Sequence, residues 1–403
     1  MQRSPAHSDP SAIQSCQSIE PFADIFRSPI DKASPIVAGR PALVIFEADG
    51  LPAGQQWLKP GEQADPSEEI AARIEARRER PIRASAGYST SVVICTRDRP
   101  EELRRCLASF ADQSWTPDEL IVVDNASRDQ RTRDVVLSAG ATYIREDRPG
   151  LDFARNSGAR AAHGDIVLYT DDDTELHERW VESTIAAFDA PDIMAVTGLV
   201  LPARLDTEAQ WIFETEWSFG RGFDRIDYGY DFFSQNGRYG CPAWIVGAGA
   251  NMAFRRIIFD RVGYFDERLD VGQAGCSGDS EFWYRILAAG YICRYEPLAV
   301  MFHHHRLEMS GLASQIYHYM RGHTAALMVQ YQRTGETGNL RRAFVLLPKY
   351  YLGLLANRLK NGLTNKNRFL AEQIKGAAAG IWFFIRNRQM PAPPAESSDI
   401  PRR

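Results

Sequence analysis

Between residues 89 and 188 the chain alternates short, wholly apolar runs with segments whose apolar residues recur every three or four positions. Apolar runs of four to six residues predict buried strands, and the longer spacing predicts amphipathic helices. Strands that alternate with helices across short links predict parallel βαβ units in a doubly wound α/β sheet flanked by helices. The predicted strands are 91–95, 119–124, 141–144 and 165–170, and the predicted helices are 101–110, 131–138, 151–162 and 178–188.

The regions on either side of this block are less regular. Residues 1–40 are rich in Ser, Pro, Ala and Gln and predict an irregular segment, followed by one strand at 42–46. Asp65 as cap and Pro66 at the first helical position predict a helix that ends before Pro81. Further along, the pattern predicts strands at 251–254, 291–295 and 299–302, a helix at 279–289, and basic helices beyond 312.

These patterns divide the chain into four parts. They are an N-terminal extension (1–88) with one strand and one helix, an α/β domain (89–309), a helical region (310–390) and a disordered tail (391–403).

Composition narrows the function classes. Of the 403 residues, 25% are charged and 44% hydrophobic, as in ordinary globular proteins. The net charge of −5 argues against a nucleic-acid binder, which carries a basic excess. The six cysteines are scattered without a paired Cys-x-x-Cys spacing, which argues against a zinc site and favours a reduced, cytoplasmic setting.

Membrane-targeting signals are absent from the pattern. The first 20 residues lack the apolar centre of a signal peptide. No window reaches the ~20 apolar residues of a membrane-spanning helix. We therefore expect a cytoplasmic protein that touches a membrane at most from its inner face.

Polar residues stand where the predicted strands end. Thr96 follows the first strand, Asp124 closes the second, and Asp171 follows the fourth. Doubly wound sheets bind ligands at the carboxyl ends of their strands, so these side chains are expected to meet at one site.

Asp171, Asp172 and Asp173 form the strongest single chemical signal. Adjacent carboxylates repel one another, so a buried site tolerates them with a cation or strong donors. Their oxygens suit Mg²⁺ or Mn²⁺, which also bind phosphate oxygens. A solvated acidic turn that caps the next helix is the alternative. A calcium EF-hand is disfavoured because Leu176 and His177 stand where its glycine falls.

Several ordered motifs resemble glycosyltransferase family 2. They are Val-Val-Ile-Cys-Thr-Arg-Asp-Arg-Pro and Glu-Leu-Ile-Val-Val-Asp-Asn-Ala-Ser within 91–127, Gly-Leu-Asp-Phe-Ala-Arg-Asn-Ser-Gly at 150–158, Gly-Ala-Gly-Ala-Asn-Met-Ala-Phe-Arg at 247–255, and Gly-Asp-Ser-Glu-Phe-Trp-Tyr-Arg at 278–285. The resemblance covers roughly 90–305. It implies a GT-A fold, which is a Rossmann-like, mostly parallel sheet flanked by helices. It also implies an inverting transferase that uses a nucleotide-sugar donor and a divalent cation.

The resemblance also implies roles for single residues. Asp173 would be the main metal ligand, helped by Asp171. The residues implied for nucleotide-sugar binding are Thr96, Arg97, Asp124, Arg155, Asp171 and Asp172.

Asp279 resembles the family's catalytic base. Inversion needs a base that takes the proton of the attacking acceptor hydroxyl. Many relatives carry two consecutive acids here, whereas Gly278 precedes Asp279 in this chain. Glu281 is the second candidate. Asp279 is also a good helix cap, and both roles are compatible.

His303, His304, His305 and Arg306 follow the predicted strand 299–302. Strand alternation puts His303 and His305 on one side. Related transferases often place a histidine near the metal or diphosphate here. We assign His305 to the metal, with His303 as the other candidate and Arg306 beside a diphosphate. A polar strand end without a ligand is the alternative.

The stretch 211–244 is rich in aromatic residues and has two interpretations. It packs as the core of an insertion, or it forms the lip that stacks on an acceptor sugar. Trp244 is placed near the site because it precedes the 247–251 motif, in which Asn251 is the other acceptor-side candidate.

The segment 310–390 contrasts with the acidic whole. It carries twelve Lys and Arg against two Glu, a local balance of +10. Basic amphipathic helices of this type bind anionic membrane surfaces, which would suit a saccharide acceptor linked to a lipid. Packing against the main domain or a dimer partner is the alternative, and a homo-oligomer stays open.

The sequence therefore predicts transfer of one sugar to a hydroxyl acceptor. A non-catalytic domain that only binds nucleotide-sugar is the first alternative, although Asp279 argues against it. A sugar nucleotidyltransferase is the second, but the segment after the first strand, 96–100, lacks the glycines of that class. A processive synthase is disfavoured because no Gln-x-x-Arg-Trp motif follows the base.

Overall fold

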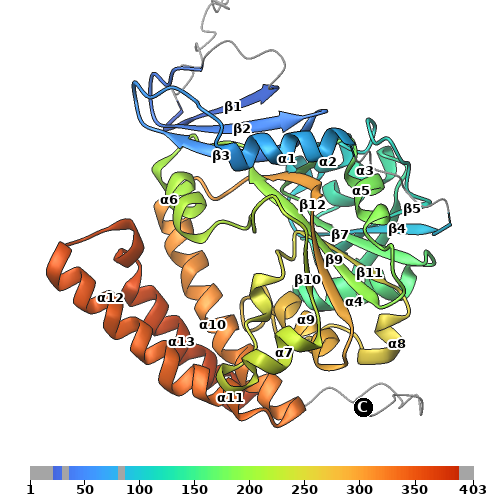
Figure 1. The fold of residues 1–403 in the computed structure, drawn as a ribbon. Coiled ribbons are helices and arrows are strands. Elements are labelled where there is room, and N and C mark those ends of the chain that lie inside the picture. The colour runs from blue at the N-terminus through green and yellow to red at the C-terminus, as the bar shows by residue number, and fades with distance from the viewer. Residues whose placement is uncertain (1–20, 30–35, 80–86, 390–403) are drawn as a thin grey trace, which may run out of the picture.

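The computed structural model describes residues 21–29, 36–79 and 87–389. A large curled sheet flanked by helices occupies its centre, a three-stranded sheet lies at one end, and a group of helices runs along one side (Figure 1). The predicted disordered tail, the end of the first helix and the first 20 residues lie outside the described part of the chain.

One half of the central sheet is parallel, as predicted. The strands β4 (Thr90–Thr96), β5 (Glu119–Asn125), β6 (Thr142–Glu146) and β7 (Ile166–Asp171) stand in the order β6-β5-β4-β7. Thr96 pairs with Asp124, and Cys95 pairs with Asp171. The three predicted strand ends therefore meet at one edge.

Helices cover this half on both faces. They are α2 (Pro100–Ala108), α3 (Arg131–Ser138) and α4 (Leu151–Ala161), whereas α5 (Trp180–Ala186) packs on the other half of the sheet. Gly158 on α4 lets the helix lie close to the sheet, since a Cβ there would be 3.3 Å from Val123 Cγ2. The GT-A expectation of a mixed α/β fold is confirmed.

The other half of the sheet is mixed. The strands β8 (Thr174–Leu176), β9 (Ile193–Pro202), β10 (Ile226–Tyr228), β11 (Asn251–Arg255) and β12 (Ile292–His303) build it. β11 lies antiparallel between β7 and β9, and β12 pairs in parallel with β9. β9 was not among the predicted strands. β12 runs as one strand across a register shift, where two strands were predicted.

Short elements connect these strands. They are α6 (Glu208–Trp217), α7 (Tyr230–Asn236), the 3₁₀ turns η2 (Gly237–Tyr239) and η3 (Ala243–Ile245), α8 (Ile258–Val262) and α9 (Gly278–Ala288). The aromatic stretch divides between two environments. Phe213 and Phe233 are buried, whereas Trp217, Phe219 and Trp244 line a cavity.

The N-terminal extension holds three strands rather than the one predicted. β1 (Asp24–Pro29), β2 (Ala42–Ala48) and β3 (Leu51–Leu58) form a separate sheet, with α1 (Glu68–Glu79) against it. β3 escaped prediction because Pro52, Gly54 and two glutamines break its apolar pattern. α1 begins later than predicted, because Ser67 Oγ, not Asp65, accepts from the backbone N–H of Ile70.

The C-terminal region is helical, as expected. It comprises α10 (Met309–Thr334), α11 (Thr337–Arg341), the π-turn η4 (Arg342–Leu346), α12 (Leu347–Asn361), the 3₁₀ turn η5 (Asn365–Asn367) and α13 (Leu370–Arg386). Thr324 Oγ1 on α10 donates to the Ala377 carbonyl on α13 at 3.0 Å. Among the described helices, none has a stretch both long and apolar enough to cross a membrane.

Candidate active site

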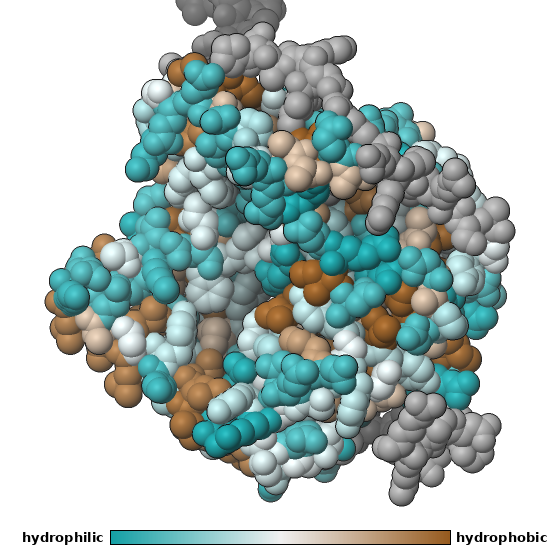
Figure 2. Space-filling view, in the orientation of Figure 1, coloured by the Kyte–Doolittle hydropathy of each residue, from teal (hydrophilic) through white to brown (hydrophobic). Residues whose placement is uncertain are grey.

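A cavity of 1390 Å³ opens between the strand ends of the central sheet and the C-terminal helices. The molecular surface is hollowed between these two parts in the space-filling view (Figure 2). Of the residues predicted from the sequence, Thr96, Arg97, Arg155, Asp171, Asp172, Asp173, Trp244, Asp279, His303 and Arg306 line it.

The acidic run lies at the end of β7 and is tightly held. Thr96 Oγ1 donates to Asp172 at 2.7 Å. Arg99 Nη1 donates to Asp172 and Asp173, each at 3.0 Å. Asp172 is thus occupied on both oxygens by protein donors, and the run is not a solvated turn.

Asp171, Asp173 and His303 form a candidate cation site, since one ligand atom from each lies within 4.8 Å of the others. His303 Nε2 lies 3.3 Å from Asp173 Oδ1, and that oxygen is buried without a hydrogen-bond partner. Two carboxylates and one imidazole suit Mn²⁺ or Mg²⁺. The unpartnered buried oxygen is available to coordinate such a cation.

Charge crowding changes the pKa values of the acidic run. Burial and Asp173 raise the pKa of Asp171 to about 6, against the field of Arg155. Burial and Asp173 likewise raise the pKa of Asp172 to about 7. Burial opposes ionisation of Asp173 too, but His303 and Arg99 hold the pKa of its carboxyl well below the usual range. The run therefore concentrates its negative charge on Asp173.

The structure places His303, and not His305, in the cation group, which reverses our assignment. The two rings lie on one side of the chain, as alternation predicts, and share a hydrogen bond between their Nδ1 atoms at 3.0 Å. His305 Nε2 is bound to Glu214 Oε2 at 3.0 Å. His305 therefore orients His303 from behind. Glu214 lies on α6 and carried no signal in the sequence.

Asp279 lies in the first turn of α9 and faces the cavity. Its Oδ1 accepts from the Ser280 backbone N–H at 2.6 Å, so it also helps to cap the helix. Burial and Asp270 raise its pKa, whereas Arg155 opposes the shift.

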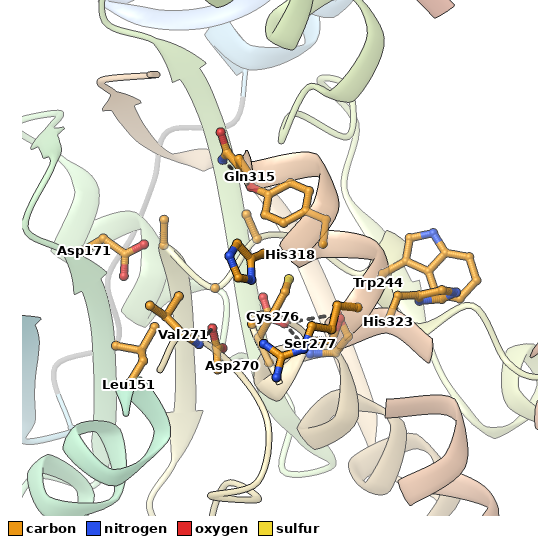
Figure 3. Close-up of a pocket in the computed structure, with 18 of the residues that line it drawn as sticks. Leu151, Asp171, Trp244, Asp270, Val271, Cys276, Ser277, Gln315, His318 and His323 are labelled. Carbon is orange, nitrogen blue, oxygen red and sulfur yellow. Dashed lines mark hydrogen bonds between the residues drawn. The ribbon is translucent and has the colours of Figure 1, made fainter. Parts of the chain in front are cut away.

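Arg155 is buried and joins two acids that the sequence analysis did not single out. Its Nη1 donates to Asp152 at 3.0 Å and to Asp270 at 2.6 Å. The i, i+3 spacing of Asp152 and Arg155 on one helix was a usable signal. Asp270 was not predictable, because it lies in a loop outside any helix or strand and its partner Arg155 is 115 residues away in the sequence. Figure 3 shows Asp270 beside Val271 on the cavity wall.

Besides His305, three predicted residues lie away from the cavity, namely Asp124, Asn251 and Glu281. Asp124 is buried beneath it and accepts from the Ser127 N–H, Tyr143 Oη and Arg145 Nη1 at 2.8 to 2.9 Å. Base contact by Asp124 would require these donors to move.

The buried side chains of Asn251 and Glu281 are bound to other residues of the protein. Asn251 Nδ2 donates to the carbonyls of Leu199 and Ala299, and its Oδ1 accepts from Trp180 Nε1. Glu281 is fully buried and paired with Arg285 and Arg333. Neither lines the cavity, because both side chains bind other elements of the domain.

Part of the chain is similar in sequence to known proteins. Residues 91–263 match the family described as Glycosyl transferase family 2. A glucosyl-dolichyl phosphate glucuronosyltransferase of Haloferax volcanii is 27% identical over 188 residues, which are 44% of this chain and 55% of that protein. A TPR repeat-containing protein of Synechococcus elongatus is 42% identical over 127 residues, 31% of this chain and 29% of that protein. The chain thus spans about half the length of these relatives or less.

Among solved structures, the mannosyltransferase PcManGT from Pyrobaculum calidifontis, in complex with GDP-Man and Mn²⁺, is similar with a TM-score of 0.49 and 17% identity. The match covers 77% of this chain and 93% of that chain.

Proposed function

We propose that this chain, whose residues 91–263 match glycosyltransferase family 2, moves one sugar from a nucleoside-diphosphate sugar to a hydroxyl acceptor with inversion. The observation that carries the proposal is one continuous cavity that joins the cation group of Asp171, Asp173 and His303 to Asp279. Leaving group and acceptor would then meet in a single space.

The donor end would be held by charge. Asp171, Asp173 and His303 would hold Mn²⁺ or Mg²⁺, which when bound neutralises the charge on the departing diphosphate. Arg306 lines the same end and matches phosphate oxygens with its guanidinium group. Thr96 at the end of β4 and the following Arg97 line the same cavity and would contact the nucleotide.

The acceptor end would be governed by Asp279. Its carboxylate takes the proton of the acceptor hydroxyl while the new bond from that oxygen to the anomeric carbon forms. The bond from this carbon to the diphosphate breaks on the opposite face, which inverts the configuration. Burial raises the pKa of Asp279, and a base closer to the working pH is the more effective one.

The proposal extends to a saccharide acceptor, free or linked to a lipid, and to a peripheral position on an anionic membrane. The apolar side chains of Leu346, Leu347 and Tyr350 close the cavity on the side of α12. Exposed apolar residues continue from there over α12 (Figure 2). One relative is itself named for a dolichyl-phosphate-linked sugar.

Turnover of a panel of nucleotide sugars with Mn²⁺ tests the proposal. Asp279→Asn is expected to lose about 10²- to 10⁴-fold in nucleoside-diphosphate release, the usual contribution of a general base. Binding of the nucleoside diphosphate should persist, because the carboxylate is not part of the cation group. The matched control is Asp260→Asn, an exposed aspartate on α8.

The outcomes separate the alternatives. Full turnover in Asp279→Asn would contradict the assigned base. Nucleotide-sugar binding without turnover on any saccharide would favour a non-catalytic domain. Release of pyrophosphate from a nucleoside triphosphate and a sugar phosphate would favour a nucleotidyltransferase.

A further inference from the structure

The end of the cavity that lies away from the cation group is basic. Figure 3 shows Asp171 on one side of the cavity and Trp244 with His323 together on the other. Arg221 and Arg342 line the cavity at that second end. No part of the mechanism above uses them.

The two arginines are both held at Trp244, one by its backbone carbonyl and one over its ring. Arg221 Nη2 donates to the Trp244 carbonyl at 3.2 Å. The guanidinium carbon of Arg342 lies 4.8 Å from the Trp244 ring centroid, and its Nε and Nη2 donate to the Gly240 carbonyl. The ring of His323 packs edge-on against Trp244 at 4.7 Å. Such a wall is preorganised, since its side chains are held by packing and by backbone acceptors.

Neither guanidinium has a carboxylate within salt-bridge distance among the residues that the structure describes. All of their protein hydrogen bonds go to backbone carbonyls, and Arg221 Nε is buried with no acceptor. Burial lowers the pKa of both arginines. Because an uncompensated buried cation is costly, this wall favours an anion.

His323 adds no charge to this end. Burial and the field of Arg342 lower its pKa to about 4, so its ring is neutral near pH 7. The positive charge of the wall therefore comes from the arginines.

The position of the pair assigns it to the acceptor rather than to the donor. Arg221 is close enough to Asp279 for the carboxylate to oppose the effect of burial on its pKa. The donor end has its own cations, since Arg99 is bound to the acidic run and Arg306 lies beside it. An anion on the Arg221 wall would thus sit on the side of the base.

We propose that Arg221 and Arg342 bind a phosphate group carried by the acceptor, beside the hydroxyl that Asp279 activates. This inference rests on the proposed function and adds the chemical class of its acceptor. A guanidinium pair matches phosphate oxygens in geometry as well as charge. The apolar side chains of Leu346, Leu347 and Tyr350 line the adjoining wall, where an alkyl chain attached to that phosphate would lie.

Calorimetry on the full chain, saturated with nucleoside diphosphate and Mn²⁺, tests the proposal with three probes. They are decyl phosphate, inorganic phosphate and the uncharged decyl maltoside. Decyl phosphate is expected to bind, and Arg342→Gln to weaken it at least tenfold, or about 1.4 kcal/mol. Arg341→Gln is the matched control, because Arg341 lies over Tyr239 and does not line the cavity.

The three probes distinguish a soluble phosphorylated acceptor from a lipid-linked one. Equal affinity for inorganic phosphate and decyl phosphate supports a soluble phosphorylated acceptor, and tighter binding of decyl phosphate supports a lipid-linked one. Decyl phosphate binding that is no tighter than that of decyl maltoside, or that is unchanged in Arg342→Gln, overturns the proposal.

A pair of variants at Arg221 separates loss of charge from loss of folding. Arg221→Gln removes hydrogen bonds to three backbone carbonyls, so Arg221→Lys, which keeps the charge, is measured beside it. Arg221→Lys should weaken decyl phosphate less than Arg221→Gln does, and equal losses overturn the role of the charge. Binding of nucleoside diphosphate with Mn²⁺ reports the donor site separately. If the unmodified chain did not bind nucleoside diphosphate with Mn²⁺, the proposed function would be contradicted. Binding of decyl phosphate to Arg221 and Arg342 could still be measured in that case, so the two failures are distinguishable.

Discussion

Two carboxylates share one guanidinium beside the proposed base. Asp152 and Asp270 both accept from Arg155, and Asp279 lies in the field of all three. The same cluster explains why a glycine precedes the base. A Cβ at Gly278 would collide with the carboxylate of Asp152, so Asp152 fills the place of a side chain there. Residue 278 itself has no carboxylate, and the carboxylate of Asp152 on α4 lies at that place instead.

The cluster gives the pH dependence of transfer a definite sign. Asp279 acts when ionised, and its pKa is raised by burial and by Asp270. Activity should therefore fall as the pH drops through that raised pKa. Asp270→Asn removes a negative neighbour, lowers the pKa of Asp279 and should move the acid limb of kcat/KM to lower pH. Asp260→Asn should not move it, and an upward shift in Asp270→Asn would contradict the arrangement.

At the scale of elements, the loop before β11 sets the distance between the base and the sheet. A Cβ at Gly249 would lie 2.7 Å from Asp279 Oδ2 and 2.9 Å from Arg155 Nη2. Any side chain at this position displaces one of these groups. The loop is therefore a positioning element for the base.

Gly249→Ala should reduce turnover by about 10- to 100-fold, because small displacements of reacting groups have effects of this size. Nucleoside diphosphate binding should be retained, since the cation group lies on other elements. Steady-state kinetics beside thermal unfolding checks this. Gly229→Ala is the control, because its Cβ would meet only Ile292 at 3.8 Å. Unchanged turnover in Gly249→Ala would contradict the positioning role of this loop.

The elements also show what the sequence could predict. The parallel strands follow from their apolar runs, and their shared edge brings Thr96 and Asp171 to one cavity. Alternation put His303 and His305 on one side, but the choice between them depends on Glu214, which arrives from α6. Long-range partners of this kind leave no local pattern. The strand β9 did leave a local pattern, namely two apolar runs at 193–196 and 199–201 separated by Thr197 and Gly198, but it was not predicted.

At the scale of the whole molecule, the C-terminal helices both close the cavity and present an apolar surface. Leu352, Leu359 and Trp382 are 66%, 81% and 56% exposed. The same helices carry basic residues, namely Lys349, Arg358, Lys360, Lys375 and Arg386. This combination is typical of helices that lie in a membrane interface.

We expect the full chain to co-sediment with anionic vesicles at low salt, and binding to fall as salt screens the basic helices. Leu359→Asp and Trp382→Asp should each weaken binding, because a charge enters the apolar face. Leu137→Asp is the matched control, being 55% exposed on α3. Vesicle binding that is absent, or unchanged in both variants, would leave the helices with a purely structural role.

The central claim is that Asp171, Asp173 and His303 hold a cation that binds the diphosphate of the donor. Calorimetric titration of the full chain with nucleoside diphosphates, with and without Mn²⁺, tests it most directly. The account predicts tight binding of one diphosphate with Mn²⁺, and loss of that binding both without the cation and in Asp173→Asn. Equal binding without a divalent cation, or full Mn²⁺-dependent binding in Asp173→Asn, would contradict it.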